Sequence, residues 1–452
     1  MLIDLDCISS KFKYILFFIL FSLISVAPPF QSPDEFAHYT RSYSLLKFNF
    51  FEPTVEIEQT LNDYFWGYEQ IPYHYDRKLT DEKINSTKHL RWKDKNNKVQ
   101  RGIVSAIIYV PFIYLPQTVV IEIGRICNFS IHNTYLIGRI INVLLCLSIL
   151  NFAFYFRKPN LTTLLILCMP MTLFQMSYTT PDGILFCLVV LIFSLFLKLI
   201  NDAEINYKYM LILTFAILIF CGHRLNCVPF LALPSIVFLF KSKIKQAIFW
   251  LAGYLLFFVL WFFLYKIHVS ETIKSDYTLS YKGFYYLTHI NETARILFST
   301  LTNNDLLHFY WKSFIGQLGW LDYALRGSKI RFLTIFLIIS CFLSFRIREN
   351  YKEVLLALLL VLISFFLIFI CLLVQWTTFP NATLIEGIQG RYFIPIALAV
   401  SCLFTENSIS TESKNSKLLF WKNCTSSVIF FLFVCYSVYV TITATLLRYY
   451  AN

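Results

Sequence analysis

Residues 354–375 read VLLALLLVLISFFLIFICLLVQ, an apolar run without one charged side chain. A helix of this length rises about 1.5 Å per residue and therefore matches the hydrocarbon core of a bilayer, which is about 30 Å thick. Ten further apolar runs occur at 14–29, 134–156, 161–178, 182–200, 209–222, 226–240, 246–267, 330–345, 391–404 and 426–447. The sequence therefore predicts an all-α polytopic integral membrane protein.

The overall composition agrees with this class. Of the 452 residues, 57% are hydrophobic and only 15% are charged, whereas roughly 25% are charged in an average soluble domain. A soluble enzyme, a disordered chain and a small disulfide-stapled domain are therefore excluded. Most of the 12 Cys lie within apolar runs and show no zinc spacing, so we expect them to act as small apolar side chains.

One apolar segment, 103–123, is ambiguous because Pro111 and Pro116 interrupt it. If this segment does not cross and the N-terminus is cytoplasmic, 15 basic residues fall on the cytoplasmic side, and the short outer turns contain only Arg224. The 15 are Lys11, Lys13, Arg157, Lys158, Lys198, Lys208, Lys241, Lys243, Lys245, Arg346, Arg348, Lys352, Lys414, Lys417 and Lys422. A crossing segment would reverse every later cluster, against the positive-inside rule. We therefore expect 103–123 to be interfacial or re-entrant, with about 11 transmembrane helices in total.

This topology divides the chain into five parts. They are 1–29 (cytoplasmic N-terminus and an uncleaved first span), 30–133 (first outer loop), 134–267 (helices 2–7), 268–329 (second outer loop) and 330–452 (helices 8–11, with an outer loop at 376–390). The stretch from Phe30 to Arg101 holds a third of the chain's charges and many aromatic residues. It is therefore predicted to fold as a small domain rather than to act as a linker. The net charge of +12 reflects the topology-setting residues, and no nucleic-acid partner is expected.

The densest polar motif at a predicted membrane edge is APPFQSPDEFAHYTR, residues 27–41. Ser32, followed by Pro33 and then Glu35, has the pattern of a capping box with proline at the first helical position. The motif therefore predicts a helix that begins at Ser32, directly outside the first span.

On such a helix Asp34, His38 and Arg41 would share one face, within a sector of roughly 60°. A carboxylate, an imidazole and a guanidinium together make an acid/base and anion-binding set. A structural alternative is that Asp34 and Glu35 favour the positive end of the helix dipole. That alternative explains Glu35 but not Asp34 beside His38, so Asp34 is predicted to be functional.

A second motif ends in Asp182, the only charge between Lys158 and Lys198. It closes the stretch MPMTLFQMSYTTPD at 169–182 and is predicted to lie at the outer end of a hairpin. A functional role and a simple Pro-Asp turn explain this residue equally well.

Two further motifs follow in the predicted outer segments. GQLGWLDY at 316–323 predicts a tight turn that presents Trp320 and Asp322. EGIQGRY at 386–392 places Arg391 at the outer start of a span, where a basic residue does not help topology. Its presence there indicates an anionic partner, with a contact to lipid headgroups as the alternative.

Some chemistry is absent from the sequence. The apolar runs contain almost no ionisable residue at their centres, whereas ion-coupled transporters carry such groups near the midplane. There is no phosphate-binding glycine loop, no HExxH zinc motif, no paired-cysteine zinc site and no nucleophile elbow.

Taken together, these motifs resemble the bacterial membrane-protein family catalogued as domain of unknown function 2142. That family is similar to the GT-C superfamily of integral-membrane glycosyltransferases. The matching stretches are PDEFAH at 33–38, YVPFIYLPQ at 109–117, GRIIN at 138–142, MPM…PD at 169–182, GWLD at 319–322 and QGRY at 389–392. One departure is that YALR at 323–326 replaces the proline that commonly follows GWLD.

The resemblance implies an inverting glycosyltransferase in the bacterial cytoplasmic membrane, with its active site outside. Its partners would be a polyprenyl-phosphate-linked sugar donor, a glycan or lipid acceptor, and the membrane lipids. Asp34 would be the base, with Glu35 and His38 as further catalytic residues. The substrate-binding residues would be Arg41, Asp182, Trp320, Asp322, Gln389, Arg391 and Tyr392. No cofactor is firmly implied, although a divalent metal (Mg or Mn) held by Asp34, Glu35 and Asp182 is an alternative way to neutralise phosphate.

Two other functions stay open at this point. A transporter or flippase of lipid-linked glycans would need a polar path between the spans, which the uncharged runs do not offer. A non-catalytic component of a polysaccharide assembly complex would keep the fold but would need no base.

Overall fold

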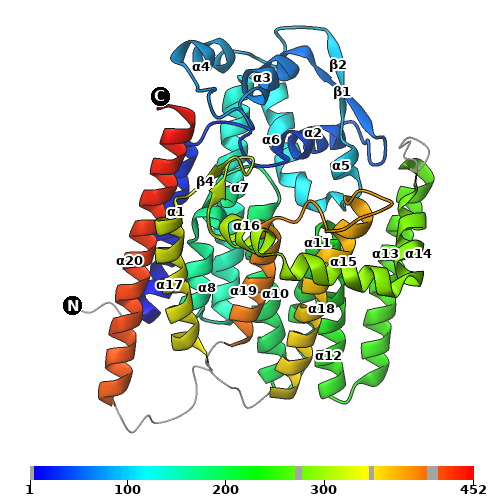
Figure 1. Cartoon of the computed structure of the whole chain (residues 1–452), viewed down its shortest axis with the longest axis vertical. Helices are drawn as coiled ribbons and strands as arrows, with labels where there is room; N and C mark the ends of the chain where they lie inside the picture. Colours follow the sequence, from blue (N-terminus) through cyan, green and yellow to red (C-terminus); the bar gives the residue numbers. More distant parts are fainter. Residues whose placement is uncertain (1–4, 270–276, 346–350, 405–415, 452) are drawn as a thin grey trace.

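The computed structural model describes residues 5–269, 277–345, 351–404 and 416–451, and they form a helical bundle with a smaller polar part covering one end (Figure 1). The long helices are α1 (Leu5–Val26), α7 (Ile131–Phe156), α10 (Asp182–Asn201), α11 (Tyr207–His223), α13 (Ile244–Val269), α17 (Gly327–Ser344), α18 (Tyr351–Gln375) and α20 (Ser416–Tyr449). Shorter bundle segments are α8 (Leu161–Leu167), α9 (Pro170–Met176), η2 (Leu225–Ala232), α12 (Leu233–Phe240), η3 (Gly390–Phe393) and α19 (Ile394–Leu403).

The remaining elements gather at one end of the bundle. The first group comprises α2 (Glu35–Leu45), β1 (Thr54–Glu58), α3 (Gln59–Glu69), α4 (Asp81–Lys88), β2 (Lys98–Gly102), α5 (Val104–Ile107), η1 (Pro111–Tyr114) and α6 (Leu115–Ile126). The second group comprises α14 (Leu279–Thr288), α15 (Ile290–Thr302), α16 (Asn304–Ile315), β3 (Gln317–Leu318) and β4 (Tyr323–Ala324).

Length and composition identify the helices that fit a bilayer. Within the described residues, seven helices are long and apolar enough to span, and three shorter apolar segments accompany them, at 207–223, 225–240 and 390–403. The prediction of an all-α polytopic membrane protein is confirmed.

The predicted span 161–178 differs from a single helix. It consists of α8 and α9, which are separated at Met169 because Pro170 cannot continue the preceding helix. Both helices are buried among their neighbours, and the adjacent α10 is buried along almost all of its length. These segments are apolar on every side because they contact protein rather than water or lipid.

The segment 103–123 also folds as expected for a stretch that does not span. It forms α5, η1 and α6, and the longest of these has 12 residues, or about 18 Å at 1.5 Å per residue. Pro111 and Pro116 each stand at the start of one of these pieces, where a missing N–H costs least.

The polar part has a buried aromatic core. Strands β1 and β2 pair antiparallel, with Thr54 opposite Gly102. Phe30, Tyr64 and Phe65 belong to a buried aromatic cluster that is distinct from the main core of the bundle and also includes Tyr135 of α7 and Tyr449 of α20. The region is therefore folded, and it packs as a small domain onto the ends of these two bundle helices.

The predicted sidedness is tested by cysteine labelling. Of the 15 basic residues that set it, Arg346, Arg348 and Lys414 lie outside the described residues. In variants with one cysteine each, an added cysteine at Asn96 and the native, exposed Cys127 should both react with an impermeant maleimide from outside. Labelling on opposite sides would overturn the 11-span arrangement.

A matched control comes from the other end of the bundle. Lys158 follows α7, is exposed, and belongs to the predicted cytoplasmic set. A cysteine at Lys158 should react only after the membrane is permeabilised.

Candidate functional site

The loop between α1 and α2 is tied to a distant helix. Ser32 Oγ donates to Gln175 Oε1 at 2.8 Å. Helix α2 begins at Glu35, and Asp34 holds the N-cap position with φ 64° and no side-chain cap bond. The prediction that Ser32 caps this helix and Pro33 starts it is wrong, because the hydroxyl binds a long-range partner and the chain turns at Asp34.

The guanidinium of Arg391 joins two carboxylates that lie far apart in the sequence. Its Nη2 contacts Asp34 Oδ2 at 2.7 Å, and its Nη1 contacts Asp182 Oδ2 at 3.4 Å. Its Nε donates to Gln389 Oε1 at 2.7 Å. Arg224 binds the other carboxylate oxygen of Asp182. We refer to Asp34, Asp182, Arg224 and Arg391 as the charge cluster.

Exposure differs sharply within the charge cluster. The side chain of Arg391 is 4% exposed and that of Asp182 is 7% exposed, whereas that of Asp34 is 53% exposed. Such burial excludes the alternative in which Arg391 merely contacts lipid headgroups. Buried charges with partners hold a fixed geometry, because the low local dielectric strengthens their attraction. Asp34 is therefore the member that a ligand reaches first, with fixed cations behind it.

Asp182 and Arg224 are positioned by helix ends. Asp182 is the first residue of α10, and Arg224 lies between α11 and η2. A simple Pro-Asp turn accounts for the place of Asp182 but not for its two guanidinium partners. Arg224 was not predicted as a site residue, although it is the only basic residue in the short outer turns. The ring of Tyr392 lies 5.3 Å from the Arg224 guanidinium and 5.4 Å from that of Arg391.

His38, on α2, belongs to a hydrogen-bonded group next to the charge cluster. Its Nδ1 lies 2.9 Å from Tyr114 Oη, which lies 3.3 Å from His223 Nε2. Burial lowers the pKa of His38 to about 4, so the imidazole is neutral at pH 7. A neutral imidazole offers no positive charge to a phosphate, but it is suited to proton transfer. Tyr114 and His223 were not predicted as site residues.

Arg41 does not lie with Asp34 and His38. Its guanidinium donates to the carbonyls of Asn49 and Phe50, each at 3.0 Å, and so closes the turn that follows α2. The predicted common face is wrong, because Asp34 precedes the helix in a left-handed conformation and is out of helical register. The geometry gives the predicted anion-binding role of Arg41 no support.

Glu35 is fully buried, and its hydrogen bonds connect separate segments of the chain. Its Oε1 accepts hydrogen bonds from Tyr135 Oη at 2.9 Å and from Thr179 N and Oγ1 at 2.9 and 2.7 Å. Burial raises the pKa of this carboxyl, and the hydrogen bonds oppose that shift only in part. Glu35 thereby links α2 to α7 and to the turn before α10.

The three acidic residues considered as metal ligands do not converge. Glu35 contacts Tyr135 and Thr179, whereas Asp34 and Asp182 share Arg391. Nowhere in the described ranges do three His, Cys, Asp or Glu side chains group closely enough to hold a metal ion. In this arrangement the guanidinium groups of Arg224 and Arg391 neutralise the carboxylates of Asp34 and Asp182.

A pair of variants distinguishes a stabilising role of Glu35 from a catalytic role. Glu35→Ala leaves the Tyr135 hydroxyl and the Thr179 donors without their acceptor, so we expect a loss of about 1–3 kcal/mol in unfolding free energy. Glu35→Gln keeps an acceptor oxygen and should stay within about 1 kcal/mol of wild type. The measurement is thermal unfolding in detergent.

The pH dependence of Glu35→Gln gives a further check. Because the folded-state pKa lies above the unfolded value, the wild-type protein loses stability as pH rises above about 4.5. The neutral glutamine does not titrate, so the stability of the Glu35→Gln variant relative to wild type should improve as pH increases. A folded Glu35→Gln protein without activity would instead place Glu35 in the chemistry.

Two buried side chains on α7 fix the loops that carry the aspartates. Arg139 donates to Ser177 O at 2.6 Å and to Ala27 O at 2.7 Å. Asn142 donates to Tyr178 O at 2.7 Å. The GRIIN motif thus holds the loop before Asp34 and the turn before Asp182 against one helix.

The GWLD motif forms the predicted tight turn, between β3 and β4. Gly319 has φ 65°, a conformation that costs glycine little. Trp320 Nε1 donates to Phe30 O at 3.0 Å, which places the indole beside the Asp34 loop. Asp322 instead pairs with Arg448 at 2.6 Å and anchors the end of α20.

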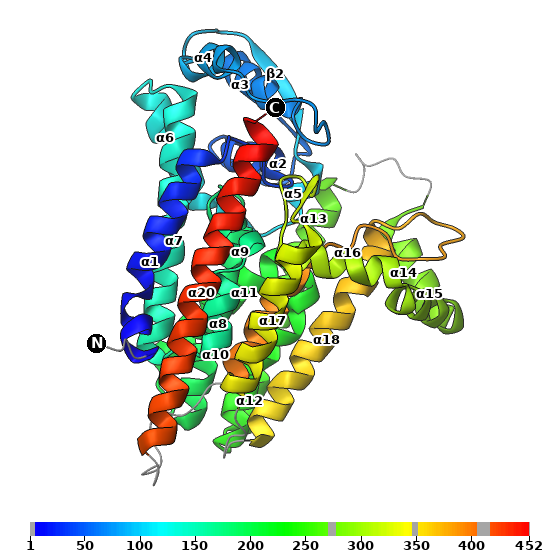
Figure 2. The same cartoon turned by 60° about the vertical axis from the view of Figure 1, so that its left-hand side comes forward.

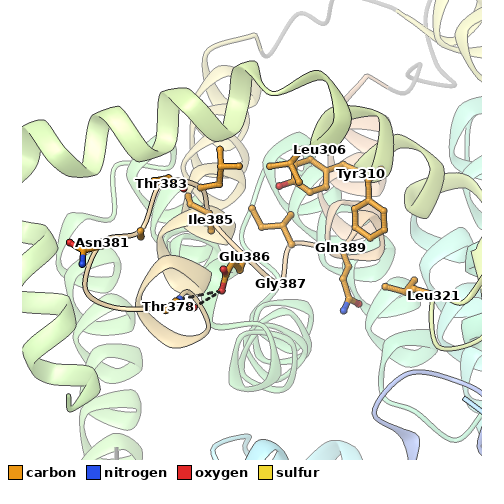
Figure 3. A pocket seen from close by; sticks show the side chains of 14 residues that line it. Leu306, Tyr310, Leu321, Thr378, Asn381, Thr383, Ile385, Glu386, Gly387 and Gln389 are labelled. Carbon is orange, nitrogen blue, oxygen red and sulfur yellow. Dashed lines mark hydrogen bonds between the residues drawn. The ribbon is translucent and has the colours of Figure 1, made fainter. Parts of the chain in front are cut away.

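A cavity of about 640 Å³ lies between α16 and the segment 378–389. Tyr310, Ile385 and Gln389 are among its lining residues (Figure 3). The carboxylate of Glu386 accepts hydrogen bonds from Thr378 N and Oγ1, and these bonds hold the segment in a loop. Gln389 both lines the cavity and binds Arg391, so the cavity and the charge cluster share one wall.

These features define a multi-pass, all-α membrane protein with a polar site at one end of its bundle. The sequence matches the family model described as "Predicted membrane protein (DUF2142)" over residues 15–400, and the chain belongs to this family. No curated protein and no solved structure shows a significant match. The resemblance to this family is confirmed, and its extension to glycosyltransferases stays a prediction.

Proposed function

We propose that the protein is an inverting glycosyltransferase that moves a sugar from a polyprenyl-phosphate-linked donor to a glycan or lipid acceptor. The reaction would occur on the outer face of the bacterial cytoplasmic membrane. The observation that carries the proposal is the bridge from buried Arg391 to half-exposed Asp34 at 2.7 Å. It sets a candidate base and a candidate phosphate-binding group side by side.

The proposed chemistry uses these two groups directly. Asp34 takes the proton of an acceptor hydroxyl, whose oxygen attacks the anomeric carbon of the donor sugar. The bond between that carbon and the phosphate oxygen breaks, and the polyprenyl phosphate leaves with the bonding electron pair. Arg391 donates to the leaving phosphate from Nη2, and Arg224 adds positive charge behind it.

The Arg391–Asp34 contact also supports an order of events. A phosphate oxygen that accepts from Arg391 Nη2 takes the position of Asp34 Oδ2, and the carboxylate of Asp34 is released from its ion pair. Asp182 keeps Arg391 in place during this exchange, because it binds Arg391 and Arg224 through different oxygens. Donor binding would thus prepare the base.

The remaining site residues frame this reaction. The proposal places the sugar of the donor or acceptor near Trp320, whose ring neighbours Phe36 and Tyr73. Gln389 holds the Nε of Arg391, while Tyr392 lies near both guanidinium groups. Asp322, which pairs with Arg448, would support the Trp320 turn rather than bind substrate.

The direct test is reconstitution of the purified protein in lipid nanodiscs with synthetic polyprenyl-phosphate sugars and a membrane-lipid extract as acceptor. Release of polyprenyl phosphate, together with transfer of the labelled sugar, is expected. Donor binding without release would favour a non-catalytic assembly component. Movement of intact donor across a sealed bilayer would favour a transporter.

A further inference from the structure

Helices α14 and α15 expose large apolar side chains away from the bundle. Figure 2 shows the pair projecting sideways from the right of the bundle, below the level of α3 and α4. Leu287 is 75% exposed and Phe298 is 69% exposed, and Phe284 and Ile290 are exposed to a similar degree. Such a cluster is unusual on a water-facing surface.

The surface of α15 divides into three sectors. Ile296 and Thr300 are buried against the protein. By the 3.6-residue period, Ile290 and Phe298 bound an apolar sector of about 80°, and polar Arg295 and Ser299 lie about 60° and 100° beyond Phe298. An apolar sector beside a polar one is the pattern of a helix that lies in a membrane interface.

The depth of α14 is marked by a neighbouring tryptophan. Helix α14 packs on α18, where Gly283 faces Val374 near the end of that helix. Trp376 directly follows α18 and is 70% exposed. Tryptophans gather at the level of the lipid headgroups, so α14 meets α18 where a span enters the interface.

We propose that α14 and α15 lie in the headgroup region of the outer leaflet, with Phe284, Leu287, Ile290 and Phe298 inserted among the acyl chains. A bilayer is the occupant that this surface fits, because α14 packs on α18, an apolar helix long enough to span whose Leu359 and Leu362 are exposed. Lys282 and Arg295 lie along the same pair of helices, where anionic headgroups would attract them.

This placement bears on the site through the segment that ends at Arg391. Phe379 packs against the rings of Tyr281, Tyr285 and Tyr286 on α14. Thr300 on α15 accepts a hydrogen bond from Ile385 N at 2.9 Å. Both helices therefore hold one wall of the cavity described above.

A functional consequence follows for the cavity. Helices seated on the membrane would keep the cavity at the level where a lipid-borne phosphate resides. That consequence depends on the proposed donor, whereas the membrane position of α14 and α15 does not.

Spin-label accessibility in liposomes tests the position. The full-length protein receives one nitroxide label at Leu287 or Phe298, and a matched control label at exposed Arg295 in the polar sector of α15. Collision rates with oxygen, which concentrates in lipid, and with a water-soluble nickel complex are then measured. The ratio of oxygen to nickel collisions should be several-fold higher at Leu287 and Phe298 than at Arg295.

Each other outcome overturns the inference. Equal ratios at the three positions would place both helices in water. Immobile labels at Leu287 and Phe298 that collide with neither reagent would show a protein partner or a second copy instead. Because no donor is present in this measurement, its failure is separate from a failure to detect sugar transfer.

Discussion

Asp34→Asn is expected to lower sugar transfer by roughly 10²–10⁴-fold, the usual loss on removal of a general base. Asparagine keeps the size of the side chain and still accepts a hydrogen bond from Arg391, but it has no basicity at neutral pH. The defect should therefore lie in turnover, while the affinity for a polyprenyl-phosphate donor stays close to that of wild type. Single-turnover transfer and equilibrium donor binding, measured in nanodiscs, separate the two.

A surface aspartate of the small domain supplies the control for this experiment. Asp63 pairs with Lys95 at 2.6 Å, away from the charge cluster, and Asp63→Asn should leave transfer unchanged. Transfer at a near wild-type rate by Asp34→Asn would reduce Asp34 to a residue that shapes the start of α2.

Arg391→Ala should weaken donor use by roughly 10- to 150-fold, which corresponds to a charge-assisted hydrogen bond of about 1.5–3 kcal/mol. Arg391→Lys should show a smaller loss, because an ammonium offers a point charge in place of two parallel donors. Folding should survive both changes, since Asp182 keeps Arg224 as a partner when Arg391 is lost. Size-exclusion profiles and thermal unfolding check this before activity is compared.

The dependence on the sugar identifies what Arg391 contacts. If it binds phosphate, the loss should be equal for donors that carry different sugars. A loss confined to one sugar would move Arg391 into the sugar pocket. Unchanged donor use in Arg391→Ala would contradict any role in anion binding. Arg125→Ala, which removes a partner of Glu58 in the small domain, is the matched control.

Much of the architecture could be predicted because apolar burial acts locally along the chain. A run such as 354–375 is apolar enough to specify a span wherever its neighbours lie. The prolines at 111 and 116 likewise interrupt their own segment because they lack a backbone N–H. This effect is local in the chain. The predicted span 161–178 was only partly right. Pro170 divides it into two short helices, but both are buried and apolar, so the hydropathy of the segment does not reveal the division.

Three of the four members of the charge cluster could be predicted, but Arg224 and the pairings could not. The sequence by itself determined the class of protein, the long apolar helices and the presence of Asp34, Asp182 and Arg391 at helix ends. Only the tertiary structure decided that one guanidinium bridges both aspartates, that Glu35 is buried under Tyr135, and that Arg41 closes a backbone turn. The physical reason is that the free energy of transfer from water to an apolar medium is a sum of contributions from individual residues. The partner of a charge, in contrast, depends on which side chain arrives within about 3 Å, and Asp34 and Arg391 are 357 positions apart.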